Sequence, residues 1–291
     1  MIWRAGLSDH ILDSAALDRM HAAALQILER TGIAVGHAGI LREIAGRVGF
    51  RMFDGRVRIN PSRVEAWRQS TAICCQAAAG APSKSLAHRN FRCVVSNRPS
   101  SVVASDGVTV RPMTTADVIA GTKLVDVLHA RGVEGNTVGT PTDVPIALQL
   151  PAQILIGAEY SREGGSASNL VCDVQTAEIV LEMDAVYGRS HSQSVWCPSP
   201  LRLDGSELEI LWHFRNTVKS ACVGSMPVMG LTAPCDPFAA FTLAVAECIG
   251  GATILSELMP GIPVSICPHP MTMDPRTGVM VFGSPEWEIL D

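Results

Sequence analysis

Hydrophobic and polar positions repeat with a helical period in the first part of the chain. Residues 14–31 place apolar side chains at this spacing, and Gly32 follows where a helix cap is expected. The pattern predicts a second, shorter helix over residues 40–48. Asn60 and Pro61 then predict the start of a third helix, with Asn60 as its N-cap and Pro61 in its first turn.

Two Asp-Gly pairs predict turns between short strands. Asp54-Gly55 lies between two apolar segments within residues 50–59, which is a strong signal for a two-residue hairpin. Asp106-Gly107 has the same position within residues 102–110. A helix over residues 114–129 follows, with a threonine as its expected N-cap. The front of the chain therefore reads as helices and hairpins without a strand–helix repeat.

From about residue 132 onward, short apolar segments alternate with longer helical ones. Each apolar segment has the length of a buried strand, and successive strands are about 30–35 residues apart, the spacing of βα units in a parallel sheet. The strands are predicted at 132–138, 168–172, 195–197, 223–229 and 263–267, and the helices at 145–160, 174–187, 206–219 and 237–259.

This order predicts an α/β fold of the (β/α)8 TIM-barrel type. We expect a helical and hairpin N-terminal cap over residues 1–100 and a partial barrel domain over residues 101–291. Five βα units are fewer than the eight that close a barrel, so the barrel is predicted to be incomplete. Open sheet edges favour association, and we therefore expect a homo-oligomer.

Charge and cysteine usage exclude some classes of protein. The net charge is −5 and no block of Lys or Arg occurs, so nucleic-acid binding lacks its usual electrostatic signature. The nine cysteines are scattered, mostly within apolar segments, which is typical of reduced thiols in a cytoplasmic protein.

The helix predicted at 237–259 is long and apolar enough to cross a membrane. Glu247 lies in its middle, where a charge costs roughly 2.5–3.5 kcal/mol on insertion scales. No Lys or Arg occurs between Cys235 and Asp274 to anchor a span. A buried crossover helix is the better interpretation, and no membrane association is expected.

Several short strings within this framework match a known pattern. The strings are Arg111-Pro-x-Thr-x-x-Asp117, Pro227-x-x-Gly230-x-Thr232-x-Pro234, Ala246-Glu247, Asp274-x-x-Thr277-Gly278 and Gly283-Ser284-Pro285-Glu286. Together they resemble the trimethylamine:corrinoid methyltransferase family, including its members without pyrrolysine. The resemblance implies a longer barrel, of which this sequence would cover roughly the first two-thirds.

The resemblance also implies a site at the carboxyl ends of the strands, over a methylated amine. No acid–base pair or nucleophile motif stands out, so no catalytic residue is assigned. Gly230 reads better as a turn-forming residue, and His269 fits a site role and a structural role equally well. Glu247 reads better as a paired residue of the helix layer than as a catalytic one. The expected substrate-binding residues are Tyr160, Trp196, Ser199, Met229, Gly230, Thr232, His269, Met271, Asp274 and Glu286.

The expected reaction moves a methyl group from trimethylamine, or a quaternary amine such as glycine betaine, to the Co(I) of a corrinoid. A partner corrinoid protein would carry that cofactor, and this chain would bind none directly. Quaternary ammonium groups carry no hydrogen-bond donor, so aromatic faces and nearby carboxylates would hold them. Two alternatives stay open: a zinc-assisted methyltransferase using Cys267 and His269 with Cys197 or Cys235, and an inactive fragment or binding subunit.

Overall fold

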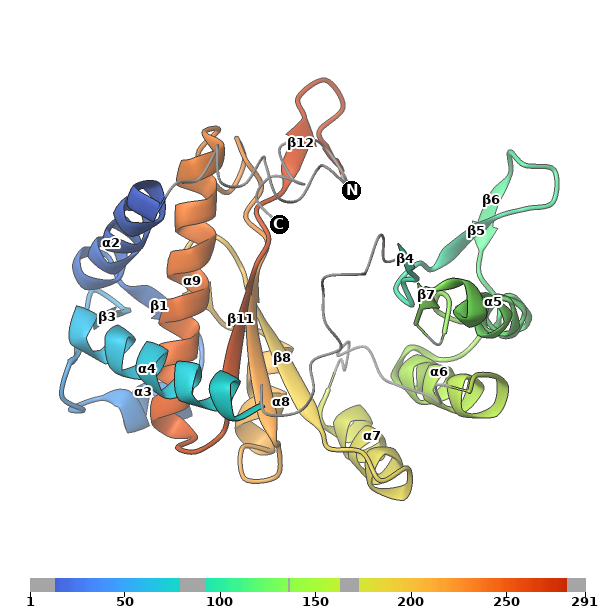
Figure 1. The fold of residues 1–291 in the computed structure, drawn as a ribbon, viewed down its shortest axis with the longest axis horizontal. Coiled ribbons are helices and arrows are strands. Elements are labelled where there is room, and N and C mark those ends of the chain that lie inside the picture. Colours follow the sequence, from blue (N-terminus) through green and yellow to red (C-terminus); the bar gives the residue numbers. More distant parts are fainter. Residues whose placement is uncertain (1–13, 79–92, 136, 163–172, 282–291) are drawn as a thin grey trace. The chain divides into compact units, whose positions relative to one another are not determined.

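The computed structural model describes residues 14–78, 93–135, 137–162 and 173–281. Its backbone contacts divide the chain into two compact units, residues 1–83 with 191–291, and residues 84–190. The fold is a mixed α/β arrangement, as predicted (Figure 1). The division into a cap of residues 1–100 and a barrel domain of 101–291 stays a prediction.

The first unit is built around a parallel three-stranded sheet. Its strands are β8 (Ser192–Cys197), β10 (Ser220–Ser225) and β11 (Val264–Pro268), in the order β11-β10-β8. All three lie at or next to strands predicted from the apolar segments. Parallel neighbours need a crossover, and helix α9 (Pro237–Leu258) supplies the one between β10 and β11.

Helix α9 packs on one face of this sheet, and helices α2 and α4 pack on α9 (Figure 1). A Cβ atom at Gly251 would lie 2.9 Å from Cγ1 of Val223, so the helix backbone approaches the strand closely. The apolar core of the unit lies between these layers. By length and composition α9 could cross a membrane, but 78% of its most apolar window is buried inside the fold. Burial of this kind is typical of a core helix.

The N-terminal elements join this unit through a second sheet, with strand order β2-β3-β1-β9. Strand β1 pairs in parallel with β9, which follows β8 in the chain. The Asp-Gly hairpin is confirmed, with both turn residues at positive φ (48° and 71°). The elements are α2 (Ser14–Arg30), β1 (Ile33–Val35), α3 (Ala38–Ile44), β2 (Phe50–Phe53), β3 (Arg56–Ile59), α4 (Pro61–Ala78), β9 (Arg202–Leu203) and α8 (Ser206–His213).

Two predicted helices of this unit are shorter than the periodicity suggests. Helix α3 ends at Ile44 instead of residue 48, because Gly46 adopts a left-handed φ of 83° that ends the helix. Helix α8 ends at His213 instead of residue 219, since the chain turns there and the backbone N–H of Thr217 bonds to the carbonyl of Phe214. A hairpin of β12 (Thr272–Asp274) and β13 (Val279–Val281) follows β11.

The described residues of the second unit form three α-helices, one short 3₁₀ helix and two short strand pairs. Helices α5 and α6 pack together, and α6 packs on α7. The strand predicted at 132–138 is only two residues long, because Gly132 and Gly135 on either side of it adopt positive φ. The elements are β4 (Cys93–Val94), β5 (Ser101–Val103), β6 (Val110–Pro112), α5 (Thr115–Leu128), η2 (His129–Arg131), β7 (Val133–Glu134), α6 (Ile146–Tyr160) and α7 (Val174–Val186).

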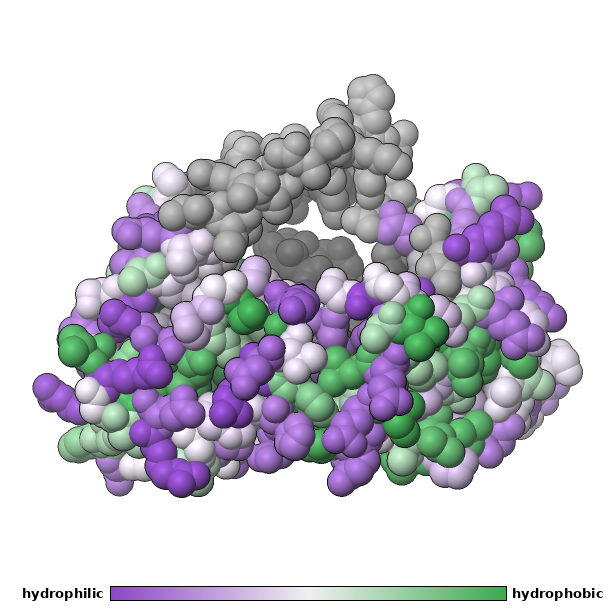
Figure 2. Space-filling view, turned by 90° about the horizontal axis from the view of Figure 1, so that it is seen from below, coloured by the Kyte–Doolittle hydropathy of each residue, from purple (hydrophilic) through white to green (hydrophobic). Residues whose placement is uncertain are grey.

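The surface of the chain mixes apolar and polar side chains. Figure 2 shows green, hydrophobic areas interspersed with purple, hydrophilic ones on the face that it presents. Exposed apolar residues of this kind are ordinary on folded proteins.

The strand predicted at 168–172 lies outside the described residues. A closed barrel is not seen among the residues that the structure describes, so the TIM-barrel assignment stays a prediction.

Candidate functional site

The face of the parallel sheet that points away from α9 carries the strongest candidate site. Alternate residues of a strand point to opposite faces, and Val223 and Cys197 point toward Gly251 of α9. Their neighbours along the strands therefore point the other way. Gly224 is the register partner of both Trp196 and Cys267, so these three residues form one row across the face of β8, β10 and β11 that points away from α9.

Gly224 makes room for the indole ring of Trp196. A Cβ atom at this glycine would lie 2.5 Å from Cε3 of the tryptophan, closer than real Cβ atoms approach. Any larger residue at position 224 would have to displace the ring. The ring therefore lies across the backbone of the central strand, and it presents an aromatic surface beside the strand ends.

His269 extends this surface past the end of β11. Its ring stacks on that of Trp196, with centroids 6.4 Å apart and planes 24° apart. Its Nε2 lies 2.9 Å from Sγ of Cys267. The backbone N–H of His269 donates to the carbonyl of Ser225 at 2.8 Å, which fixes the turn of the chain here. Trp196, Cys267 and His269 thus form one half-buried cluster.

Beneath the strand ends, on the α9 side of the sheet, lies the buried carboxyl group of Glu247. Its Oε1 accepts from the backbone N–H of Leu201 at 2.6 Å, and its Oε2 accepts from the hydroxyl groups of Ser199, at 2.7 Å, and Ser225. Burial raises the pKa of Glu247, against the lowering effect of these three hydrogen bonds. The residue was expected to pair inside the helix layer, but its partners belong to β10 and the loop after β8, which it holds together.

Met229, Gly230, Thr232 and Met271 shape the loops after β10 and β11. Gly230 adopts a φ of 79°, and the Thr232 hydroxyl accepts from the backbone N–H of Val228 at 2.8 Å. The N–H of Met229 donates to the carbonyl of Met271 at 2.8 Å, joining the two loops. The side chain of Met271 is buried. These residues support the backbone near the aromatic cluster.

Three further expected site residues belong to other segments of the chain. Asp274 belongs to the β12–β13 hairpin, where its Oδ1 accepts from the N–H of Arg276 at 2.9 Å and its carbonyl from that of Gly278. Tyr160 ends helix α6 in the other unit, with the Lys123 ammonium 4.6 Å from its ring centroid. Glu286 lies outside the described residues.

The sequence interpretation missed Gly224, although a signal for it existed. A glycine inside a strand pattern often marks a close approach by another group. Cys267 was considered only as a zinc ligand. The contact between its thiol and the imidazole follows from their placement two residues apart at the end of one strand, which the sequence alone does not show.

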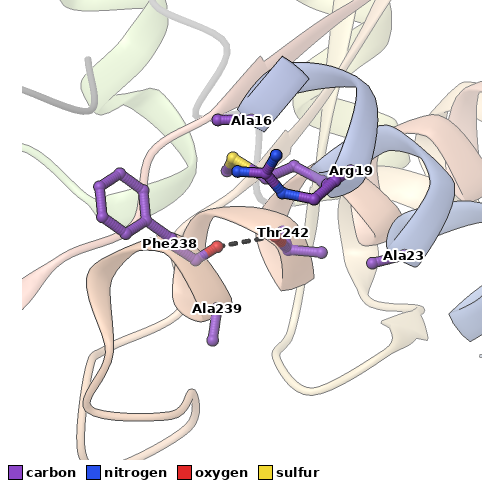
Figure 3. A pocket seen from close by; sticks show the side chains of 7 residues that line it. Ala16, Arg19, Ala23, Phe238, Ala239 and Thr242 are labelled. Carbon is purple, nitrogen blue, oxygen red and sulfur yellow. Dashed lines mark hydrogen bonds between the residues drawn. The ribbon is translucent and has the colours of Figure 1, made fainter. Parts of the chain in front are cut away.

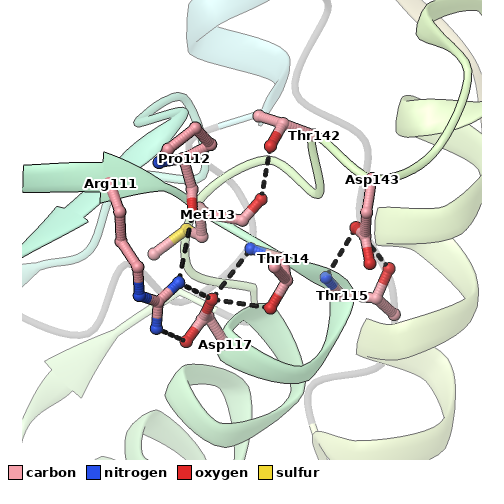
Figure 4. A network of polar contacts seen from close by, with 8 residues as sticks. All are labelled: Arg111, Pro112, Met113, Thr114, Thr115, Asp117, Thr142 and Asp143. Atoms are coloured by element: carbon pink, nitrogen blue, oxygen red, sulfur yellow. Dashed lines mark hydrogen bonds and ion pairs between the residues drawn. The ribbon is translucent and has the colours of Figure 1, made fainter. Parts of the chain in front are cut away.

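In the second unit, the Arg111-Pro-x-Thr-x-x-Asp117 string forms the start of helix α5 (Figure 4). Both terminal nitrogens of Arg111 contact Asp117 at 2.7 Å, and Thr114 forms a capping box with the same carboxylate. The Arg111 guanidinium and the Thr114 donors hold the pKa of Asp117 well below its usual range. Asp143 accepts from the N–H and hydroxyl of Thr115, at 2.8 and 2.9 Å. The threonine N-cap is confirmed.

A shallow groove lies between helices α2 and α9 of the first unit (Figure 3). Apolar side chains form most of its wall. Among the described residues that line it, Arg19 is the one charged residue, so they offer no carboxylate, imidazole or thiol. It is lined by Ala16, Arg19, Met20, Ala23, Phe238, Ala239 and Thr242.

The zinc hypothesis requires a third ligand beside Cys267 and His269. Cys197 is buried on the opposite face of the sheet, toward α9, and Cys235 is exposed. Within the part of the chain that the structure describes, no group of three His, Cys, Asp or Glu side chains is placed to hold a metal ion. The described residues therefore supply two ligands of such a site and not a third.

A model of a known protein family matches nearly the whole chain. The family model described as trimethylamine methyltransferase (MTTB) matches residues 4–291. A search of curated proteins finds no match. The family match extends over both units of the chain, so it includes the strands of the parallel sheet and the start of α5 alike.

Proposed function

The chain belongs to the trimethylamine methyltransferase family, and from this premise we propose that it transfers a methyl group from a methylated amine to a corrinoid protein. Membership of this family supports the general activity of a methylamine methyltransferase. The nature of the amine site, the corrinoid acceptor and the roles of particular residues are the content of the proposal.

The aromatic surface of Trp196 is the observation that carries this proposal. A methylated ammonium group is a cation with few or no hydrogen-bond donors, so it binds best against the face of an aromatic ring. Such a contact contributes about 0.5–2 kcal/mol, depending on how far it is desolvated. Gly224 and the stacked ring of His269 hold the indole in place. The row therefore offers a preformed surface at the strand ends.

The reaction needs little acid–base help from the protein. In an in-line displacement at the methyl carbon of a quaternary amine, the C–N electron pair stays on nitrogen and a neutral amine leaves. A corrinoid in the Co(I) state, carried by the partner protein, supplies the nucleophile. The chain itself supplies orientation and a site without competing hydrogen bonds. The absence of an assigned acid–base pair among the described residues is consistent with this chemistry.

We further propose that β8, β10 and β11 are successive strands of a (β/α)8 barrel whose interior is the face that points away from α9. Parallel order, the crossover by α9 and the placement of that helix on one face support this. In barrels of this type, sites lie at the carboxyl ends of the strands, where Trp196 and His269 are found.

Binding and turnover test the proposal separately. Purified chain is titrated with trimethylamine, tetramethylammonium and glycine betaine by calorimetry. It is then assayed for methyl transfer to Co(I) cobalamin, which the change in the visible spectrum reports. Trp196→Leu is expected to weaken binding roughly 2- to 30-fold, whereas Trp196→Phe retains an aromatic face and most of the affinity.

Equal affinity of the leucine variant and the native chain would rule out Trp196 as the binding surface. A folded chain that binds amines but transfers no methyl group would support the alternative of an inactive binding subunit.

A further inference from the structure

The thiol of Cys267 has a neighbour that can activate it. Its Sγ lies 2.9 Å from Nε2 of His269, within hydrogen-bonding distance of a nitrogen that can accept the thiol proton. A thiolate is the nucleophilic form of cysteine, and an adjacent imidazole is one of the groups that increases its population. The residue is half-buried and is not enclosed in the core as Cys197 and Cys248 are.

The backbone builds this pair. Cys267 and His269 are two residues apart, so their side chains leave the strand on the same side. The bond from the N–H of His269 to the carbonyl of Ser225 holds the chain in position after β11. Gly224 is the register partner of Cys267, and the Trp196 ring occupies the space over this glycine. The Trp196 ring stacks on the imidazole and limits its movement.

Other cysteines of the unit serve as internal comparisons. Cys197 and Cys248 are buried, and burial raises the pKa of each thiol well above its usual value. Cys222 lies on the same face of the sheet as Cys267, but its register neighbours are Ser194 and Ser265. Cys235 is exposed. The described residues of this unit thus include buried, half-buried and exposed thiols, and the observed hydrogen bond of His269 is to Cys267.

We propose that Cys267 and His269 form a nucleophilic thiol site for small uncharged electrophiles, and that its modification closes the neighbouring amine surface. With iodoacetamide, the thiol proton passes to Nε2 of His269 and the sulfur forms a bond to the methylene carbon. Iodide then leaves with the C–I electron pair. The first half of the proposal stands on the thiol–imidazole contact alone. The second half rests on the proposed function, since it requires the amine to bind at Trp196.

The test compares alkylation rates in the full chain. The chain is treated with limiting iodoacetamide at pH 7, and labelled peptides are quantified by mass spectrometry over time. A thiol without activation is only a few per cent thiolate at this pH, so we expect Cys267 to react roughly tenfold faster than Cys222. Cys267→Ser confirms the identity of the labelled peptide.

Two histidine variants separate activation from access. His269→Gln and His269→Asn both remove the base, while the shorter Asn opens more space beside the thiol. Activation by the imidazole predicts roughly tenfold slower labelling of Cys267 in both variants. Simple access predicts faster labelling in the asparagine variant. Circular dichroism spectra close to that of the native chain show that both variants are folded and can be compared.

Labelling of Cys222 or Cys235 as fast as that of Cys267, or native rates in both histidine variants, would overturn the thiol site. The second half has its own readout: saturating tetramethylammonium should slow labelling of Cys267 at least severalfold in the native chain. Fast labelling that the cation does not slow would reject the link to the amine surface while retaining the thiol site. A failure of methyl transfer affects neither rate, so the two proposals fail separately.

Discussion

The start of helix α5 and the strand ends of the parallel sheet use polar residues in opposite ways. At α5, Arg111, Thr114 and Asp117 satisfy one another on an exposed surface. At the strand ends, the buried carboxyl group of Glu247 accepts from the backbone N–H of Leu201. On the other face of the sheet, the rings of Trp196 and His269 stack on each other. In the first region, the polar side chains bond to one another. In the second region, an aromatic surface and the thiol of Cys267 lie next to each other.

This contrast shows what the recognisable strings encode. Both regions carry strings that resemble the family, but in each region these residues mainly shape the backbone. Gly230 and Thr232 form a loop, and Asp117 caps a helix. Trp196, Cys267 and His269 all lie outside the strings. Backbone requirements thus leave a clearer sequence pattern than the binding surface does.

The largest effect on stability is expected at Glu247. Glu247→Ala leaves three donors without their acceptor in a buried site, and we expect a loss of about 3 kcal/mol or more of unfolding free energy. Urea denaturation followed by tryptophan fluorescence measures it. Glu247→Gln keeps one acceptor oxygen and the side-chain volume, so it should lose less. Equal, small losses in both variants would show that the carboxyl group does not hold the loops together.

The same carboxyl group should make stability depend on pH. Its pKa is raised in the folded state above 4.5, so the folded chain binds more protons than the unfolded chain in this window. Its contribution is therefore fully present below pH 4.5 and is lost as the pH rises through the folded pKa. Denaturation midpoints of the native chain and of Glu247→Gln are measured from pH 4 upward. The midpoint of the native chain minus that of the variant should fall with increasing pH. A rise of this quantity would contradict the direction of the shift.

Gly224→Ala should have a smaller effect on stability and a clear effect on binding. The added methyl group forces the Trp196 indole to move, at a cost of about 1–3 kcal/mol, and should weaken amine binding. Calorimetric titration with tetramethylammonium measures the affinity. Ser194→Ala, which lies on the same face of the neighbouring strand, is the matched control and should bind normally. Unchanged affinity in the glycine variant would separate the ring from the amine site.

The smallest effect is expected at the start of α5. Asp117→Asn loses the ion pair with Arg111 but keeps an oxygen that can accept from Thr114, so it should lower stability only slightly and leave amine binding unchanged. The pKa of Asp117 is lowered in the folded state, so the contribution of this carboxylate is present above the unfolded pKa and is lost as the pH falls. Weakened amine binding in this variant would show that the two regions do not differ in the way described.

The sequence supported most of the local structure for identifiable reasons. The Asp-Gly hairpin, the Asn60-Pro61 helix start and the long apolar helix α9 depend on backbone preferences and periodicity, which act within a few residues. The ends of α3 and α8 were wrong because a single glycine or turn stops a helix whose apolar pattern continues. Among the expected site residues, the structure brings together Trp196 and His269. Asp274 belongs to the β12–β13 hairpin, and Tyr160 belongs to the second unit.

By itself, the sequence determined the α/β pattern, the family and the buried nature of the crossover helix, because each depends on spacing along the chain. Only the tertiary structure decided which side chains meet. The row of Trp196, Gly224 and Cys267 depends on the pairing of three strands, and a shift by one residue would turn it toward α9. Register joins residues about 28 and 43 positions apart, a distance over which no local preference acts.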